Sequence, residues 1–167
     1  MRVATCALGY VAIQLGKALG CRVIATTHRE TKLPLLVEAD ESILDDGRLY
    51  NRVHGVTKAL DLVGPRFLRD TLYAVEKHGI VCNTGVLGGV FALNGFDPIK
   101  EIPNGVYLSG FHSNFPAQET IDNIFSFLND HQLAPKKAAV YNFDAIRDAC
   151  IALDSGKVNG KIVVTIH

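Results

Sequence analysis

Short runs of β-forming residues alternate with amphipathic helical stripes along the whole chain, and this alternation constrains the fold most strongly. Strands are expected at residues 23–26, 41–44, 58–63, 80–85, 106–111, 139–143 and 161–166. Helices are expected after Gly9, Pro65, Pro116 and Asp144, with shorter ones at 32–37 and 49–53. Strands that alternate with helices favour a parallel, doubly wound α/β sheet. The length of 167 residues suggests a single domain, residues 1–167.

The opening stretch predicts half of a nucleotide-binding βαβ unit. Val3 to Gly9 leads into a helix with apolar Val11, Leu15 and Leu19 on one face, and a second strand follows. Small residues in the turn would let the backbone approach a pyrophosphate, which free N–H groups at the helix start would hold. Only Gly9 is a glycine of the usual pattern, so an ordinary turn between strand and helix is an equal alternative.

The end of the second strand bears on the choice of nucleotide. An acidic residue at this point commonly binds the ribose hydroxyls of NAD. Here Thr27 is followed by Arg29 and Lys32, and no acid stands at the strand end. Two cations and a hydroxyl favour a ribose 2′-phosphate, with Arg29 as a charge-assisted donor. The alternative is that both cations are solvated charges at the start of a helix.

Two later strand ends carry polar or small residues. Thr84 and Gly85 follow an apolar run and would line the crevice at the carboxyl edge of a parallel sheet, where ligands bind, although a simple turn explains them almost as well. Asp61 interrupts another apolar run, and we interpret it as structural. Residues 86–105 show no period and are long for a loop, which indicates function or an interface.

Composition excludes several classes of function. Lys plus Arg and Asp plus Glu number 17 each, so no net field draws in nucleic acid or an anionic membrane. Apolar runs are too short to span a bilayer, and no metal-binding cysteine pair is present. The four cysteines are widely spaced and are expected to be buried free thiols, which fits a cytoplasmic protein.

With these segments placed, the sequence resembles the nucleotide-binding domain of the medium-chain dehydrogenase/reductase superfamily, and most closely the quinone oxidoreductase (zeta-crystallin-like) branch. The resemblance covers essentially the whole chain, in order. It rests on residues 4–9 (ATCALG), 12–20 (AIQLGKALG), 23–27 (VIATT), 60–64 (LDLVG), 79–85 (GIVCNTG), 96–98 (FDP), 102–106 (IPNGV) and 160–164 (GKIVV).

The resemblance implies a Rossmann fold, NADPH as cofactor, and hydride transfer to a quinone or an activated carbonyl or alkene without zinc. It places Ala7, Leu8 and Gly9 at the pyrophosphate, Arg29 and Lys32 near the 2′-phosphate, and Thr84 and Gly85 beside the nicotinamide. It also implies a homodimer through the strand at 106–111. No catalytic acid or base is assigned.

The chain departs from this family in two respects. The first strand is truncated to about residues 2–5, and the N-terminal chaperonin-10-like catalytic domain is absent from the sequence. Three functions therefore stay open: the cofactor domain of an NADPH-dependent oxidoreductase, weak or inactive alone; a non-catalytic truncated paralogue that binds nucleotide or dimerises; and an interaction protein that binds no nucleotide.

Overall fold

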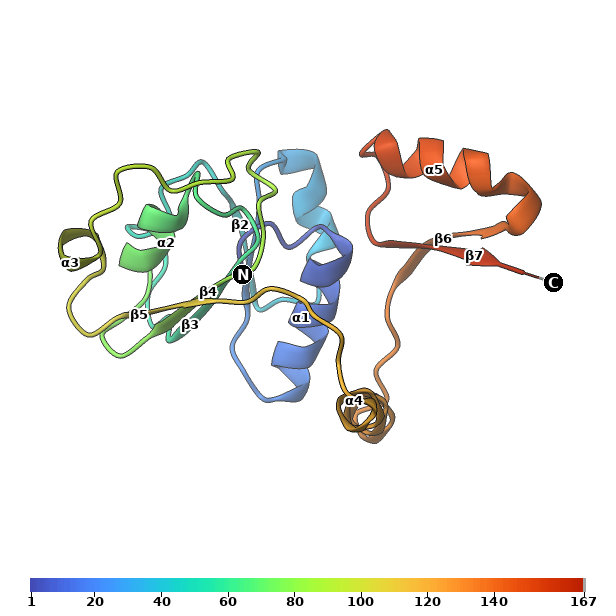
Figure 1. The fold of residues 1–167 in the computed structure, drawn as a ribbon, viewed down its shortest axis with the longest axis horizontal. Coiled ribbons are helices and arrows are strands. Elements are labelled where there is room, and N and C mark those ends of the chain that lie inside the picture. Colours follow the sequence, from blue (N-terminus) through green and yellow to red (C-terminus); the bar gives the residue numbers. More distant parts are fainter. Residues whose placement is uncertain (167) are drawn as a thin grey trace.

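The computed structural model describes residues 1–166; His167, the last residue of the expected domain, lies outside the described residues. Helices and strands alternate as predicted, except that β3 follows β2 without a helix between them (Figure 1). The elements in chain order are α1 Ala7–Ala18, β1 Ile24–Thr27, the 3-10 helix η1 Glu30–Leu35, β2 Glu41–Leu44, β3 Lys58–Asp61, α2 Leu68–Tyr73, β4 Ile80–Asn83, α3 Pro98–Glu101, β5 Tyr107–Gly110, α4 Gln118–Asp130, β6 Lys137–Asn142, the 3-10 helix η2 Phe143–Ala145, α5 Ile146–Asp154 and β7 Lys161–Thr165.

The main sheet is parallel and has a short central strand. β1 pairs with β2, and β3, β4 and β5 pair in that order, all parallel. Residues 1–4 lie between β1 and β3: Thr26 N–H donates to the Met1 carbonyl, and Arg2 N–H donates to the Leu60 carbonyl. Arg2 forms a single parallel bridge with Asp61. The spatial order is therefore β2, β1, residues 1–4, β3, β4, β5, and the Rossmann-type sheet with a truncated first strand is confirmed.

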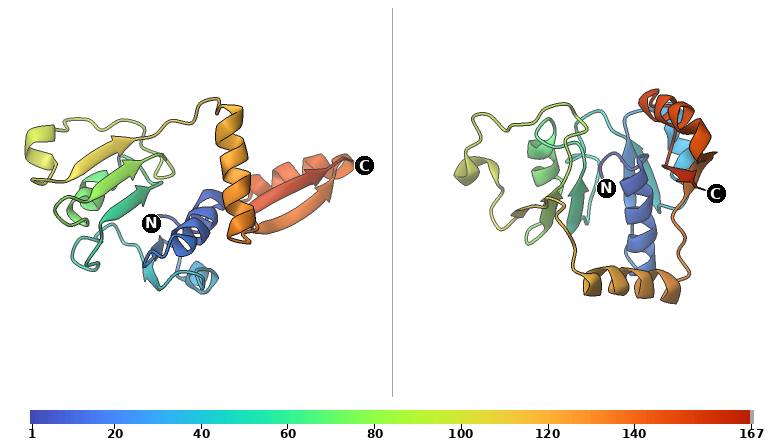
Figure 2. Two further views of the ribbon diagram at one scale, coloured as in Figure 1. Left: turned by 90° about the horizontal axis from the view of Figure 1, so that it is seen from below. Right: turned by 45° about the vertical axis from the view of Figure 1, so that its right-hand side comes forward.

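Helices cover both faces of this sheet (Figure 2). On the face of α1, Tyr10 and Ile13 pack against Ala25 in one buried cluster. On the face of α2, Leu68 and Leu72 pack against Val81 in a second cluster. The apolar stripes read from the sequence thus bury against a two-sided parallel sheet, as this class of sheet requires.

The last two strands do not join the main sheet. β6 and β7 form a separate parallel pair, and α5 is the crossover between them. Two contacts connect the segment before β6 to α1: the Gln14 side chain donates to the Ala134 carbonyl at 3.4 Å, and Lys136 lies over the Tyr10 ring at 5.1 Å. The carboxyl-terminal strands are therefore a separate two-stranded unit beside the nucleotide-binding type of sheet.

Some local expectations were wrong. Residues 49–53 form turns rather than a helix. The long segment 86–105 contains the short helix α3, which Asp97 caps by accepting from the Ile99 and Lys100 amides. The last helix begins at Ile146 after a 3-10 turn, so Asp144 is not its cap. All four cysteines are free thiols, but Cys21 and Cys150 are exposed, contrary to the expected burial. No helix within residues 1–166 has the length and apolarity needed to cross a membrane.

Candidate functional site

A crevice opens at the carboxyl ends of the central strands. Its volume is about 420 Å³. Parallel sheets of this type bind ligands at this edge, because the loops that follow the strands diverge there. The lining residues come from the turn before α1 and from the loops that follow β1, β2, β3 and β4; they are Val3, His28, Asp45, Asp46, Val63, Arg66, Phe67, Leu87 and Gly88.

α1 begins four residues after Val3, which lines this crevice, and its first amides have no intrahelical partner; Ala7, Leu8 and Gly9 themselves are not among the lining residues. Cys6 is the N-cap, and its sulfur accepts the Gly9 N–H at 3.3 Å. The first intrahelical bond runs from Tyr10 to the Cys6 carbonyl, so the amides of Ala7 and Leu8 have no intrahelical partner. Such amides and the helix dipole favour an anion. The predicted turn residues Ala7, Leu8 and Gly9 therefore have the geometry of an anion-binding helix start.

The close approach of α1 to Ala4 requires glycine at position 9. A Cβ added at Gly9 would lie 2.3 Å from the Ala4 carbonyl oxygen. Gly9 therefore lets α1 pack directly on the first-strand segment, and no other residue fits without moving the backbone. Three residues before the helix cap, Val3 has a left-handed backbone with φ of 62°. This conformation is unfavourable for a β-branched residue.

The two predicted cations lie together and unpaired. Arg29 is the N-cap of η1, and Lys32 is the third residue of this short helix. Neither forms an ion pair with a carboxylate within residues 1–166. Partial burial, followed by repulsion from Arg29, lowers the pKa of Lys32 below its ordinary value of 10.5. A nearby anion would offset this repulsion between the two cations.

Thr27 has a structural position that the sequence did not indicate. Its side chain is fully buried, accepts the Arg29 N–H at 3.3 Å and lies 3.5 Å from the Thr5 hydroxyl. It therefore orients the loop that carries Arg29 instead of presenting its hydroxyl to a ligand.

At the end of β4, Thr84 and Gly85 hold neighbouring loops together. Thr84 donates through its hydroxyl to the Phe111 carbonyl at 3.0 Å. A Cβ at Gly85 would lie 2.3 Å from the Leu62 carbonyl oxygen. Beside them, the Asn83 side-chain oxygen is buried and has no hydrogen-bond partner within residues 1–166. Asn83 lies in the segment 79–85 that carries the family resemblance, but it was not predicted as a site residue. Its unpartnered acceptor makes it a candidate ligand contact.

A buried polar network supports the crevice from below. Arg2 is 2% exposed; it contacts Asp45 at 2.7 Å and Asp70 at 2.9 Å, and it donates to the Thr71 hydroxyl at 2.8 Å. Burial raises the pKa of Asp45, but the hydrogen bond and charge of Arg2 outweigh it, and the pKa lies below its ordinary value. Asp61 accepts from the amides of Val63 and Gly64 and from the Thr71 hydroxyl, which agrees with its structural interpretation.

Sequence reasoning missed His28 and Arg66, which line the crevice. His28 lies between Thr27 and Arg29, which were predicted as site residues, and this position in the sequence could have indicated that it lines the site. Arg66 donates to the Gly88 carbonyl at 3.3 Å, a contact between two strand-end loops that no local pattern reveals.

The described residues do not offer a metal site. Within residues 1–166, no three His, Cys, Asp or Glu side chains come together in a group that could hold an ion. Zinc binding in proteins needs three or four such ligands.

One family of known proteins matches the chain by sequence. The sequence model of a family described as zinc-binding dehydrogenase matches residues 37–164. No curated protein sequence matches the chain.

Solved structures share the fold at low identity. YhfP from Bacillus subtilis with NAD bound is 19% identical with a TM-score of 0.80, and the match covers 98% of this chain and 53% of that one. YhdH from E. coli K-12 with bound NADPH is 22% identical with a TM-score of 0.74, covering 98% and 52%. A quinone oxidoreductase from Coxiella burnetii is 19% identical with a TM-score of 0.76, covering 99% and 51%. This chain thus spans about half the length of these proteins.

Proposed function

Because the chain belongs to the zinc-binding dehydrogenase family, we propose that it binds NADPH as the nucleotide-binding domain of a zinc-independent, quinone oxidoreductase-like enzyme. The pyrophosphate would lie at the free amides of Ala7 and Leu8, where Gly9 keeps the helix close to the sheet. Thr84 and Gly85, which follow β4, would border the nicotinamide.

One observation carries the preference for NADPH over NADH. At the end of β1, where an NAD-binding site commonly has an acid, Arg29 and Lys32 lie close enough for Arg29 to lower the pKa of Lys32, and neither pairs with a carboxylate within residues 1–166. A ribose 2′-phosphate would bring two negative charges to this pair, and Arg29 can donate two parallel hydrogen bonds to it. Of the solved neighbours, YhfP was solved with NAD and E. coli YhdH with NADPH, which supports a nicotinamide dinucleotide as the ligand.

The reaction proposed for the complete enzyme is hydride transfer from NADPH to a quinone or to an activated carbonyl or alkene. The cofactor supplies the hydride, and the protein supplies binding and orientation. The residues of this chain would fix the phosphates and the nicotinamide ring. The matched neighbours are about twice as long as this chain, so we expect residues 1–167 alone to be a poor catalyst or none. The free thiols fit a cytoplasmic location.

The first prediction concerns cofactor choice. Calorimetric titration of the purified chain should give micromolar NADPH binding and at least roughly tenfold weaker NADH binding. Arg29→Ala should weaken NADPH binding about tenfold or more, since a charge-assisted pair contributes about 1.5–3 kcal/mol, and should leave NADH binding nearly unchanged.

The matched control is Arg147→Ala, because Arg147 is an exposed arginine on α5, far along the chain from the crevice. It should bind NADPH like the unchanged protein. Equal loss in both variants would show that Arg29 acts only through overall charge. No NADPH binding at millimolar concentration would reject the proposal.

The alternative function is a non-catalytic module that dimerises through β5. Tyr107 and Phe111 donate their amides to β4, so the Leu108 amide points away from the sheet at an open edge. Tyr107 and Phe111 are 58% and 60% exposed. Two copies could pair these edges about a two-fold axis and continue the sheet.

The second prediction tests this dimer. Tyr107→Lys should raise the dimer dissociation constant at least about tenfold, because a two-fold seam brings like charges together. Tyr73→Lys is the control, since Tyr73 is 53% exposed on α2 and not on this edge. Light scattering across a concentration series gives the mass. A monomer at all concentrations, or equal effects of both variants, would contradict dimerisation through β5.

A further inference from the structure

We propose that Cys6, at the start of α1, is an oxidation-sensitive thiol: hydrogen peroxide converts it to a sulfenic acid, and the added oxygen takes the anion position at the helix start and excludes the nucleotide. The exclusion of the nucleotide rests on the proposed function, in which the pyrophosphate lies at the same amides. The oxidation itself does not depend on that function.

The Cys6 sulfur lies where the start of α1 would hold an anion. It accepts the Gly9 N–H at 3.3 Å and donates to the Val3 carbonyl at 3.5 Å. The amides of Ala7 and Leu8, which follow it, form no hydrogen bond to the backbone within residues 1–166. Amides at a helix start stabilise negative charge, and reactive cysteines are commonly found at this position. An oxygen added to the sulfur would therefore meet two unused donors.

A lysine brings positive charge to the same place. Burial and then the charge of Arg29 lower the pKa of Lys32, and the negative charge of Cys6 acts in the opposite direction. The Cys6 and Lys32 side chains thus lie within range of each other's charge. A neighbouring ammonium favours a thiolate, and the thiolate is the form of cysteine that reacts with peroxides.

A buried hydroxyl without a partner points toward this turn. Tyr10 is 4% exposed, and its hydroxyl forms no hydrogen bond within residues 1–166. Tyr10 follows Cys6 by one helical turn, and side chains in a helix lean back toward its N-terminus. Burial and then the charge of Cys6 raise the pKa of Tyr10 above its ordinary value of 10.0, so the hydroxyl keeps its proton. Buried donors are nearly always paired, and a sulfenic oxygen would supply the missing acceptor.

The oxidation needs only hydrogen peroxide as co-reactant. The Cys6 thiolate attacks one peroxide oxygen, the S–O bond forms as the O–O bond breaks, and the departing hydroxide takes up the proton lost by the thiol to give water. The sulfur loses two electrons and the peroxide gains them. The thiol is half-buried, so a molecule as small as hydrogen peroxide can reach it.

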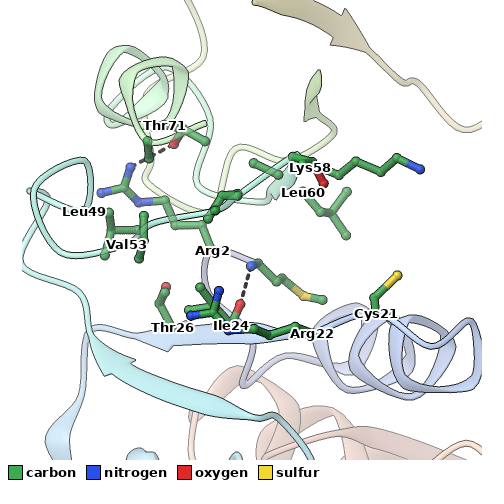
Figure 3. A pocket seen from close by; sticks show the side chains of 16 residues that line it. Arg2, Cys21, Arg22, Ile24, Thr26, Leu49, Val53, Lys58, Leu60 and Thr71 are labelled. Atoms are coloured by element: carbon green, nitrogen blue, oxygen red, sulfur yellow. Dashed lines mark hydrogen bonds between the residues drawn. The ribbon is translucent and has the colours of Figure 1, made fainter. Parts of the chain in front are cut away.

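One measurement compares the four thiols of the intact chain. Hydrogen peroxide is added together with dimedone, which traps sulfenic acids, and the label on each cysteine is quantified by mass spectrometry. Cys6 should be labelled at least about tenfold faster than Cys82, which is also half-buried but lies in β4. It should also be labelled faster than the exposed thiols of Cys150 and of Cys21, which lines a separate pocket (Figure 3). Labelling of Cys6 no faster than that of Cys82 would overturn the proposal.

The role of the hydroxyl is tested in the same way. Tyr10→Phe should slow the labelling of Cys6 at least about threefold, because it removes one hydrogen bond to the sulfenic oxygen, and should leave the labelling of Cys82 unchanged. Tyr73→Phe is the matched control, since Tyr73 is exposed on α2. Equal rates at Cys6 in the two variants would contradict the role given to Tyr10.

A second measurement tests the exclusion of the nucleotide. NADP⁺ is the probe, because it carries the same phosphates as NADPH and does not reduce peroxide. Peroxide treatment should weaken NADP⁺ binding at least about tenfold by calorimetry, and saturating NADP⁺ should slow the labelling of Cys6 by a similar factor, since such coupling is reciprocal. In Cys6→Ser, peroxide should not change the affinity. Unchanged affinity of the oxidised chain would overturn the exclusion alone, whereas no NADP⁺ binding before oxidation would reject the proposed function as well.

Discussion

At the scale of single residues, the space available to the backbone constrains the turn before α1 more than side-chain chemistry does. Gly9 allows α1 to touch the Ala4 carbonyl, whereas Val3 holds a left-handed conformation that suits glycine. The Thr27 hydroxyl accepts a hydrogen bond from the Arg29 amide. Of the three residues predicted at the end of β1, Arg29 and Lys32 keep side chains that form no ion pair within residues 1–166.

The third prediction concerns Gly9. In Gly9→Ala, the new methyl group would overlap the Ala4 carbonyl, and the helix would have to move away from the sheet. We expect the free energy of unfolding to fall by about 1–3 kcal/mol, with weaker NADPH binding. Urea denaturation measures the change. Gly110→Ala is the control, because a Cβ at Gly110 meets nothing within 4 Å; an equal loss in both would refute this explanation.

At the scale of elements, a buried arginine joins the first-strand stub to its neighbours. Arg2 lies between β1 and β3 and links to Asp45 after β2 and to Asp70 and Thr71 on α2. The stub has only a single-residue bridge to β3, so side-chain bonds supplement a short ladder. The arrangement stabilises the floor of the crevice, which Asp45 also lines.

The fourth prediction is that Arg2→Met destabilises the fold by about 3–5 kcal/mol, because it leaves the buried Asp45 carboxylate uncompensated. Urea denaturation provides the measurement. In the control Arg22→Met, which removes an exposed pair with Glu41, the loss should stay below about 1 kcal/mol. Comparable losses of stability in the two variants would mean that burial does not determine how much an ion pair contributes to stability.

At the scale of the whole molecule, the main sheet is two parallel parts held together by four residues. Residues 1–4 lie between β1 and β3 and bond to both, which joins the β1 and β2 pair to the sheet of β3, β4 and β5. The Met1 amine lies buried at this junction. The stability of the entire sheet should therefore depend on the charge of one group.

The fifth prediction gives the sign of that dependence. The amine has a pKa of about 6 in the folded protein and an ordinary value of 8.0. Between these values the unfolded chain binds more protons, so the free energy of unfolding should rise by roughly 2–3 kcal/mol from pH 6 to pH 8. Below pH 6 the burial of the amine lowers the free energy of unfolding by its full amount. Above pH 8 the amine is neutral in both states, and this destabilisation is absent.

Urea denaturation across this range tests the prediction, with the N-acetylated chain as control. Acetylation keeps an N–H for the Ile24 carbonyl but removes the titrating charge. The rise should be absent from the acetylated chain. An identical slope in both would assign the pH dependence to other groups.

The sequence alone determined the order of strands and helices, the two-sided parallel sheet and the cationic end of β1. These follow from local periodicity and residue type, which act over one or two turns of chain. The positions of α3 and of the last helix start were missed because short helices depend on tertiary contacts.

Only the tertiary structure decided the buried Arg2 network. Arg2 meets Asp45 and Thr71 across 43 and 69 residues of sequence, and no local pattern encodes such pairs. Thr27 likewise looked like a ligand contact until its burial against Thr5 was known. Long-range packing determines which polar groups form hydrogen bonds within the fold and which stay available to a ligand, because buried polar groups are nearly always hydrogen-bonded.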